Sequence, residues 1–135
     1  MVERIEIRTS GKGLFEITDA VNRIVDSSGI DSGICHTFIQ HTSAGLIIQE
    51  NADPSAKQDL ERWLDRHVME NDPNYTHTAE GPDDMPSHIR SVLTGVSLAI
   101  PVINGQLGLG TWQGIYVWEH RRRPHTRSVL VHVGE

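Results

Sequence analysis

The sequence predicts an α+β domain: a largely antiparallel β-sheet sandwich with two main inserted helices. Most apolar segments alternate with polar residues at the period of two that strands require, as residues 33–39 do. Short turns rich in Gly, Ser and Asn link most of these segments, and the main helical stretches are inserted in two places between them. A parallel, doubly wound sheet would need a helix after nearly every strand, so antiparallel pairing is favoured. A chain of 135 residues has the usual size of one domain, and we expect a single domain over residues 1–135.

The amino-terminal part predicts two strands and a short helix. Residues 2–8 alternate charged and apolar side chains, which is typical of an edge strand, and residues 13–17 continue a sheet. Thr18 or Asp19 is then a candidate helix cap, and the helix closes at residues 27–29.

Two further strands follow, at residues 33–41 and 45–49. They are separated only by Thr42, Ser43 and Ala44, so we expect an antiparallel hairpin with a polar tip. Cys35 falls on an alternating apolar position of the first strand, where a buried thiol is favoured over a nucleophile.

The longest helix begins at Asp53-Pro54, because Asp53 can cap the first turn and Pro54 suits the first helical position. A second helix runs from a cap at Asp84 to Gly95. It has His88 in its first turn, and the residues expected to face the core are Ile89, Val92 and Leu93. The chain ends in three strands, at residues 97–103, 109–120 and 127–133, the first pair linked by a turn at residues 104–105.

Composition narrows the classes of function. The formal net charge of −6 argues against a general nucleic-acid binder, which normally presents a basic face. No apolar run approaches the length of a membrane span, and the amino terminus lacks the apolar core of a signal peptide. A single cysteine excludes an intrachain disulfide, and we expect a cytoplasmic protein that acts on neither nucleic acid nor membrane.

The densest group of chemically capable side chains lies in the Gly- and Pro-rich loop at residues 75–88. His77 and His88 flank the pair Asp83 and Asp84, and imidazoles and carboxylates are the side chains that bind divalent metals and transfer protons near neutral pH. The alternative is that Asp84 only caps a helix and that both histidines are surface residues.

A second candidate segment begins at His41. His36 and His41 are an odd number of residues apart, so a regular strand turns them to opposite faces, and His41 beside Thr42 and Ser43 is the better candidate. No Gly-x-Ser-x-Gly motif accompanies Ser43, which argues against acyl-transfer hydrolysis.

Carboxylate and amide side chains complete the candidates. Glu50 follows an apolar strand and is free to face a pocket. Gln113 and Glu119 share one face of the strand at 109–120, and Trp112 and Trp118 share the other. The alternative is a solvated polar face opposite aromatic residues that pack a subunit interface.

One basic cluster stands out, formed by residues 121–123 together with Arg127. A solvated turn between strands is the favoured interpretation. The more specific alternative is an anion or phosphate contact through Arg121.

Taken together, these segments resemble the YjbQ family. The resemblance covers nearly the whole chain, in order, and its long central motif is specific. The matching segments are His41-Thr42-Ser43-Ala44, Glu50-Asn51-Ala52-Asp53-Pro54, Tyr75-x-His77-x-x-Glu80-Gly81-Pro82-Asp83-Asp84-Met85-Pro86-x-His88-Ile89, Leu93-Thr94-Gly95, Leu109-Gly110-Thr111-Trp112-Gln113-Gly114-Ile115-Tyr116 and Glu119-His120-Arg121.

The resemblance implies an α+β fold on antiparallel sheet, a homotrimer, and a polar pocket with a bound metal ion. It also implies a secondary thiamine-phosphate synthase activity, which joins a pyrimidine diphosphate to a thiazole phosphate.

Our prediction from the sequence is therefore a metal-assisted site for a phosphorylated or anionic small molecule. The expected metal ligands are His41, His77 and His88, for a divalent ion such as zinc or magnesium. The expected catalytic groups are His41, Asp84 and Glu119. The expected ligand contacts are Thr42, Ser43, Glu50, Gln113 and Arg121. The alternative function is a non-catalytic protein that binds a metal or an anionic metabolite through the same residues.

Overall fold

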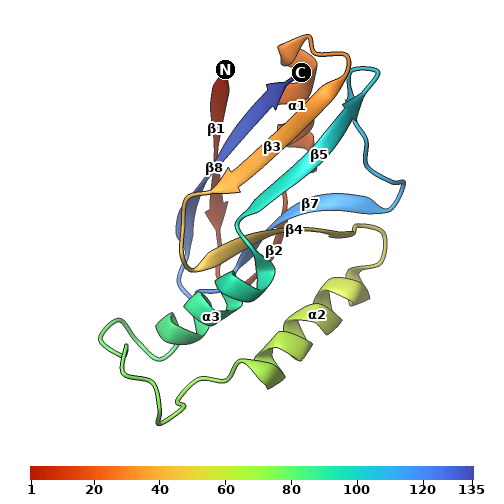
Figure 1. The fold of residues 1–135 in the computed structure, drawn as a ribbon. Coiled ribbons are helices and arrows are strands. Elements are labelled where there is room, and N and C mark those ends of the chain that lie inside the picture. The colour runs from red at the N-terminus through yellow and green to blue at the C-terminus, as the bar shows by residue number, and fades with distance from the viewer.

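The computed structural model describes all 135 residues and confirms the α+β class, with three helices and two antiparallel sheets (Figure 1). The elements are β1 (Val2–Thr9), β2 (Gly13–Glu16), α1 (Thr18–Ser28), β3 (Gly33–Ile39), β4 (Ala44–Glu50), α2 (Pro54–His67), α3 (Asp84–Thr94), β5 (Ser97–Ile103), β6 (Gln106–Leu107), β7 (Gln113–Glu119) and β8 (His125–Gly134). None of the three helices combines the length and the apolar character needed to cross a membrane.

A five-stranded sheet in the order β1-β8-β3-β5-β6 and a three-stranded sheet in the order β2-β7-β4 share one hydrophobic core. Helix α1 contributes Val21 and Val25 to this core. Cys35 is fully buried in it as predicted, and burial raises the pKa of its thiol to about 11, so the sulfur is a packing group at neutral pH.

The predicted hairpin at residues 33–49 is wrong, because β3 and β4 lie in different sheets. β3 pairs with β5 and β8, whereas β4 pairs with β7. The polar residues between them form a corner that crosses from one sheet to the other, with the carbonyl of Ser43 accepting from the amide of His120 at 3.2 Å. β3 alternates and β4 begins with a continuous buried run, and neither local pattern specifies which strand is the partner.

The helix boundaries are close to the prediction, but two caps differ. Asp53 caps α2 as predicted, accepting from the amide of Ser55 at 2.9 Å. Helix α1 instead has Ile17 at its cap position, and α3 has Asp83, neither with a side-chain cap. Because α3 begins at Asp84, His88 is its fifth residue and lies beyond the free amides of the first turn.

The face that α3 buries is mainly polar, contrary to the prediction for Val92 and Leu93, whereas Ile89 packs against a small core cluster as predicted. Val92 and Leu93 are 82% and 62% exposed, whereas Ser87, Arg90 and Ser91 are buried. The reason is that α3 lies along β4 and bonds to it, with the Ser91 hydroxyl donating to the carbonyl of Ala44 at 2.9 Å.

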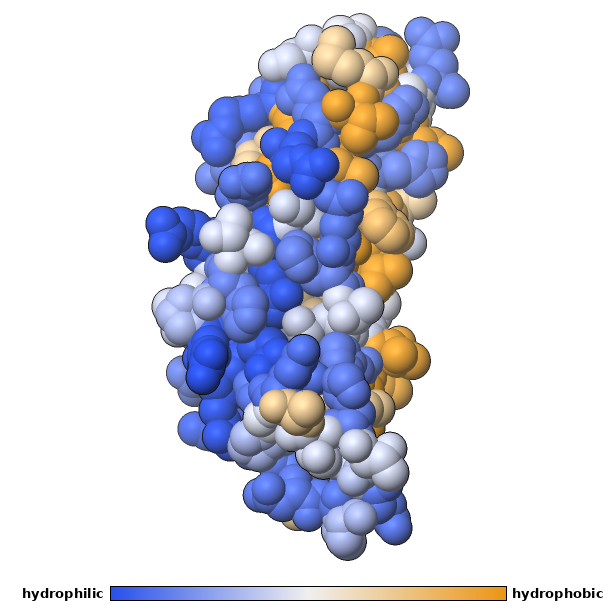
Figure 2. All heavy atoms as spheres, turned by 90° about the vertical axis from the view of Figure 1, so that its left-hand side faces the viewer, coloured by the Kyte–Doolittle hydropathy of each residue, from blue (hydrophilic) through white to orange (hydrophobic).

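The outer face of the five-stranded sheet is uncovered and partly apolar. Three exposed side chains from β1, β3 and β5 make up this outer patch: Val2, Ile34 and Ile103. The side of the molecule that faces the viewer in Figure 1 lies at the right-hand edge of Figure 2. Hydrophobic residues gather along this edge. No other element of the chain covers these three side chains.

The close approach of β4 to the end of α3 depends on a glycine. A Cβ atom on Gly45 would lie 2.0 Å from Oγ1 of Thr94 and 2.8 Å from the carbonyl oxygen of Gly95. We expect Gly45→Ala to lower the free energy of unfolding by about 1–3 kcal/mol, because the helix must move to admit the methyl group. Urea unfolding measures the change. Gly110→Ala is the control, since its Cβ would meet only a flexible side-chain oxygen of Gln113 at 3.3 Å. Equal stability of the two variants would contradict this packing.

Candidate functional site

Two histidines and a carboxylate converge where the loop after α2 enters α3. His77 comes from the loop, Asp84 opens α3, and His88 follows one turn later on the same face. The Nε2 atoms of His77 and His88 lie 2.7 and 3.4 Å from Oδ2 of Asp84, and one ligand atom from each residue falls within 4.8 Å of the others. The Asp84 side chain is only 2% exposed, whereas that of His77 is 53% exposed. The group is therefore anchored inside and open to solvent on one side.

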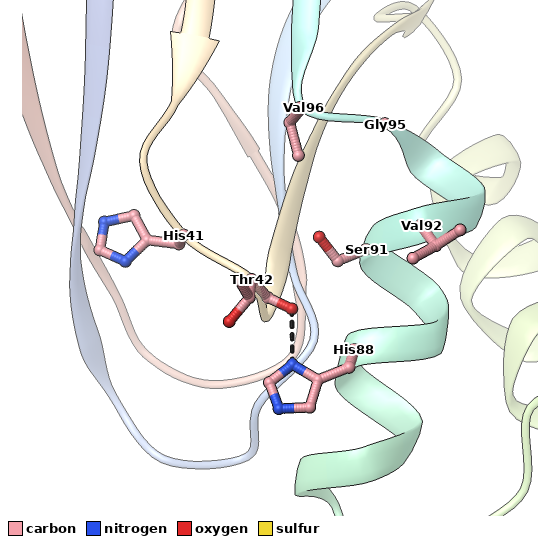
Figure 3. A pocket seen from close by; sticks show the side chains of 7 residues that line it. All are labelled: His41, Thr42, His88, Ser91, Val92, Gly95 and Val96. Atoms are coloured by element: carbon pink, nitrogen blue, oxygen red, sulfur yellow. Dashed lines mark hydrogen bonds between the residues drawn. The ribbon is translucent and has the colours of Figure 1, made fainter.

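The orientation of His88 is set by the backbone of the crossing corner. Its Nδ1 lies 2.8 Å from the carbonyl oxygen of Thr42, and a carbonyl can only accept, so Nδ1 carries the proton (Figure 3). In the neutral ring Nε2 is then left with a lone pair directed towards Asp84. A ring nitrogen held in this way is the usual form of a metal-binding histidine.

Asp84 is also held from the other side. Its Oδ1 accepts from Nη1 of Arg121 at 2.8 Å, and the Arg121 guanidinium also bonds to Asp83 and to the carbonyl of Glu80. Burial disfavours the charged form of Asp83, but the amide of Arg122 and the Arg121 guanidinium outweigh it and hold the pKa of this carboxyl below its usual range.

These contacts correct the interpretation of the basic cluster as a solvated turn for Arg121 and Arg127, whereas Arg122 and Arg123 are exposed. The side chain of Arg121 is largely buried and fastens the loop, and Arg127 is buried deeper in the protein. Pairing with carboxylates explains why the two arginines are tolerated there.

A pocket of about 580 Å³ opens beside the candidate metal-binding group of His77, Asp84 and His88 (Figure 3). His88 belongs to both, so a ligand in this pocket lies next to the position of the cation. The pocket is lined by His41, Thr42, His88, Ser91, Val92, Gly95 and Val96.

His41 lies across the corner from the candidate metal-binding group and is not part of it. Its ring points away from His88 (Figure 3), and its Nε2 accepts from the amide of Ser128 at 2.9 Å. Burial and the nearby Arg127 lower the pKa of His41, so its ring is neutral and carries its proton on Nδ1.

Beneath the corner lies a buried ion pair that was not predicted from the sequence. Glu119 and Arg127 bond through two nitrogens, and Nη2 of Arg127 also donates to the hydroxyl of Ser43 at 2.9 Å. Burial opposes ionisation of Glu119, yet Arg127 and the hydroxyl of Thr9 lower its pKa. The sequence holds a signal for this pair, because Arg127 is in step with Val129 and Val131 and so faces the core.

Glu50 and Gln113 lie away from this centre. They pair with each other at the opposite end of β4 and β7 from Glu119. Gln113 and Glu119 are six positions apart along β7, which corresponds to a distance of about 20 Å in a strand. The two side chains therefore do not line one small pocket. Instead, Glu50 accepts from the amide of Asp53, and Gln113 accepts from that of Gly110.

Comparison with known proteins gives one consistent result. Residues 3–135 match the family described as UPF0047 protein YjbQ-like. The chain is 52% identical to a UPF0047 protein of Synechocystis over 97% of its length and 89% of that protein, and 41% identical to the YjbQ protein of Escherichia coli O157:H7 over 93% and 91%. A solved structure of an uncharacterised YjbQ/UPF0047 protein from Clostridium acetobutylicum superposes with a TM-score of 0.89 at 38% identity, covering 98% of this chain and 99% of that one. A conserved hypothetical protein of Thermus thermophilus gives a TM-score of 0.87 at 33% identity, with 98% and 99% covered.

Proposed function

Because this chain belongs to the UPF0047 YjbQ-like family, we propose that it is a cytoplasmic, metal-dependent transferase with secondary thiamine-phosphate synthase activity. In this proposal His77, Asp84 and His88 hold one divalent cation, and the adjoining pocket receives the substrate whose diphosphate is displaced.

A single contact carries the proposal. The lone pair of His88 Nε2 faces a carboxylate oxygen of Asp84 at 3.4 Å, and both atoms are acceptors when the ring is neutral. Two acceptors this close are stabilised by a proton or a cation between them, and Arg121 does not take that position because it bonds to the other oxygen, Oδ1. A divalent cation bound by both atoms and by His77 occupies that position, and the donor set matches what such ions bind.

The types of donor atom favour zinc over magnesium. Two imidazole nitrogens and one carboxylate oxygen are a common protein ligand set for zinc, with a remaining position free for substrate. Magnesium prefers oxygen ligands in an octahedral arrangement, and this group offers only one carboxylate.

The proposed reaction joins a pyrimidine diphosphate to a thiazole phosphate. A carbon–oxygen bond to the diphosphate breaks as the new bond to the thiazole forms, and pyrophosphate leaves with the electron pair. The bound cation supplies charge neutralisation for the leaving group. Arg121 acts by fixing Asp84, because its guanidinium is already bonded to Asp83, Asp84 and Glu80. Val92 and Val96 give the pocket an apolar wall for a heterocycle.

A non-catalytic binding function is favoured by a different observation. Nε2 of His41 already accepts from the amide of Ser128, and Nε2 of His88 would be occupied by the proposed cation, so neither ring keeps a free basic nitrogen for a substrate proton. A protein that only binds a metal or an anionic metabolite needs no such base. Ligand-induced thermal stabilisation without turnover would favour this function.

His88→Ala tests the site directly. We expect it to weaken zinc binding by more than about 100-fold, beyond the loss caused by changing only an outer partner of a metal ligand, and to abolish turnover at the same time. Calorimetric zinc titration and an assay for released pyrophosphate measure the two effects. His67→Ala is the matched control, because that imidazole stacks on Trp63 on exposed α2, away from the site. Full turnover by His88→Ala would remove His88 from the mechanism.

We propose further that the chain assembles as a homotrimer through the outer patch. The proposal is supported by the three exposed apolar side chains of that patch, because exposed apolar surface is costly unless a partner covers it. Ile34→Lys should shift the molar mass from three chains to one by light scattering. Gln58→Lys, on an exposed position of α2, should leave it at three. A wild-type mass of one chain would refute the assembly.

A further inference from the structure

A second pocket, of about 540 Å³, lies on the other side of the crossing corner from the metal-binding group. It shares His41, Thr42 and Val96 with the first pocket, so the two meet at the corner. Its remaining lining residues are Phe38, Ile39, Gln40, Ser43 and Arg127.

Arg127 gives this second pocket a fixed hydrogen-bond donor. Its Nε and Nη2 bond to Glu119 and Ser43, which locks the plane of the guanidinium and leaves Nη1 without a protein partner. Arg127 is almost fully buried, with only 3% of the residue exposed, so its surroundings hold Nη1 in one orientation. A donor held in advance in this way binds an anion without loss of side-chain entropy.

His41 supplies a second donor to the same pocket. Its Nε2 accepts from the amide of Ser128, so Nδ1 carries the proton and forms no hydrogen bond within the protein. No carboxylate lines the pocket, and the nearest one, Glu119, is neutralised by its pair with Arg127. An anion there would meet donors and no repelling charge.

Phe38 adds a flat apolar wall. It lies on the outer face of β3 at the edge of the pocket, and about half of it is exposed to solvent. An aromatic ring exposed beside two hydrogen-bond donors suits a ligand that is aromatic at one end and anionic at the other.

We propose that this second pocket binds an aromatic phosphate monoester without the help of a metal, through Arg127 Nη1, His41 Nδ1 and the ring of Phe38. The identity of the natural ligand rests on the proposed function, in which this is the thiazole phosphate and the diphosphate substrate lies beside the cation. The two substrates then meet at the corner that the pockets share. His41 is a ligand-binding residue in this arrangement, in place of the metal-ligand role expected from the sequence.

Phenyl phosphate is a suitable probe, with phenol and inorganic phosphate as its separate halves. We expect phenyl phosphate to perturb the amide resonances of residues 38–43 and 127–128 equally in zinc-loaded protein and in metal-free His88→Ala. Phe38→Ala should weaken binding about three- to tenfold, as loss of an aromatic contact does. Arg127→Lys, which keeps a cation beside Glu119 but removes the planar donor, should weaken it about tenfold or more. Each half of the probe should bind more weakly than the whole.

Leu93→Ala is the matched control, because Leu93 is exposed and lines neither pocket. Phe38 is exposed, so its truncation cannot unfold the core and the test stands even if Arg127→Lys does not fold. Binding that disappears in metal-free His88→Ala, or that Phe38→Ala leaves unchanged, would overturn the proposal. These outcomes are distinct from failure of the proposed function, since a protein without turnover that still binds phenyl phosphate at residues 38–43 retains this pocket.

Discussion

Asp84→Asn will abolish stoichiometric zinc binding while leaving the protein folded. Asp84 is the one carboxylate of the metal-binding group, and both histidines face its Oδ2 atom. The amide of asparagine keeps an oxygen for Arg121, but it loses the negative charge that a divalent cation requires. We expect zinc affinity to fall more than about 100-fold, because a ligand is lost and not merely one of its outer partners. Circular dichroism and zinc titration measure the two properties.

Asp83→Asn separates this effect from a general loss of loop structure. Asp83 bonds to the same arginine and to the amide of Arg122, but it is not a member of the metal-binding group. It should lower zinc affinity only modestly, through weaker support of Arg121. If the two asparagine variants bind zinc equally well, Asp84 is not a ligand.

Glu119→Ala will lower the free energy of unfolding more than the other substitutions proposed for this protein. Glu119 is fully buried, and its removal leaves the guanidinium of Arg127 buried without its carboxylate. Breaking such a pair costs about 3–5 kcal/mol, because the remaining charge loses the partner that replaced water. The hydroxyl of Thr9 also loses its acceptor. Denaturant unfolding measures the loss, and a cost below about 1 kcal/mol would show that the pair is solvated.

The same carboxylate makes stability depend on pH in acid. The pKa of Glu119 is lower in the folded protein than the ordinary value of about 4.3, so its contribution is complete above that value and is lost as pH falls towards the folded pKa. His120 adds a separate window. Burial lowers its pKa to about 3, so the unfolded chain takes up the proton first as pH falls below about 6.5. His120→Gln should flatten the stability profile between these two values.

The fold class and the boundaries of most elements followed from the sequence, because alternation and capping are local properties. The cap at Asp53 depends on an amide two residues away and was predictable. The pairing of β3 and β4 was not, since partner choice depends on how both sheets bury their apolar faces. The inward face of α3 was also missed, because it is held by hydrogen bonds to β4 where a helical pattern of apolar residues was expected.

Within the candidate site, residues that are close together in the sequence were predicted better than residues that only the fold brings together. His77, Asp84 and His88 lie within twelve consecutive residues, and the structure brings them together. His41 and Glu119 were assigned to the same centre, but one faces a second pocket and the other is sealed beneath the corner. The pairing of Glu119 with Arg127 joins two strands through their core faces, which single-strand periodicity does not reveal.

We have proposed that His77, Asp84 and His88 hold a divalent cation. A crystal of the zinc-loaded protein, measured at wavelengths on either side of the zinc absorption edge, locates the ion. We predict an anomalous peak about 2.0–2.2 Å from Nε2 of His77, Nε2 of His88 and a carboxylate oxygen of Asp84. A zinc peak at other residues, or none in crystals grown with excess zinc, would contradict the claim.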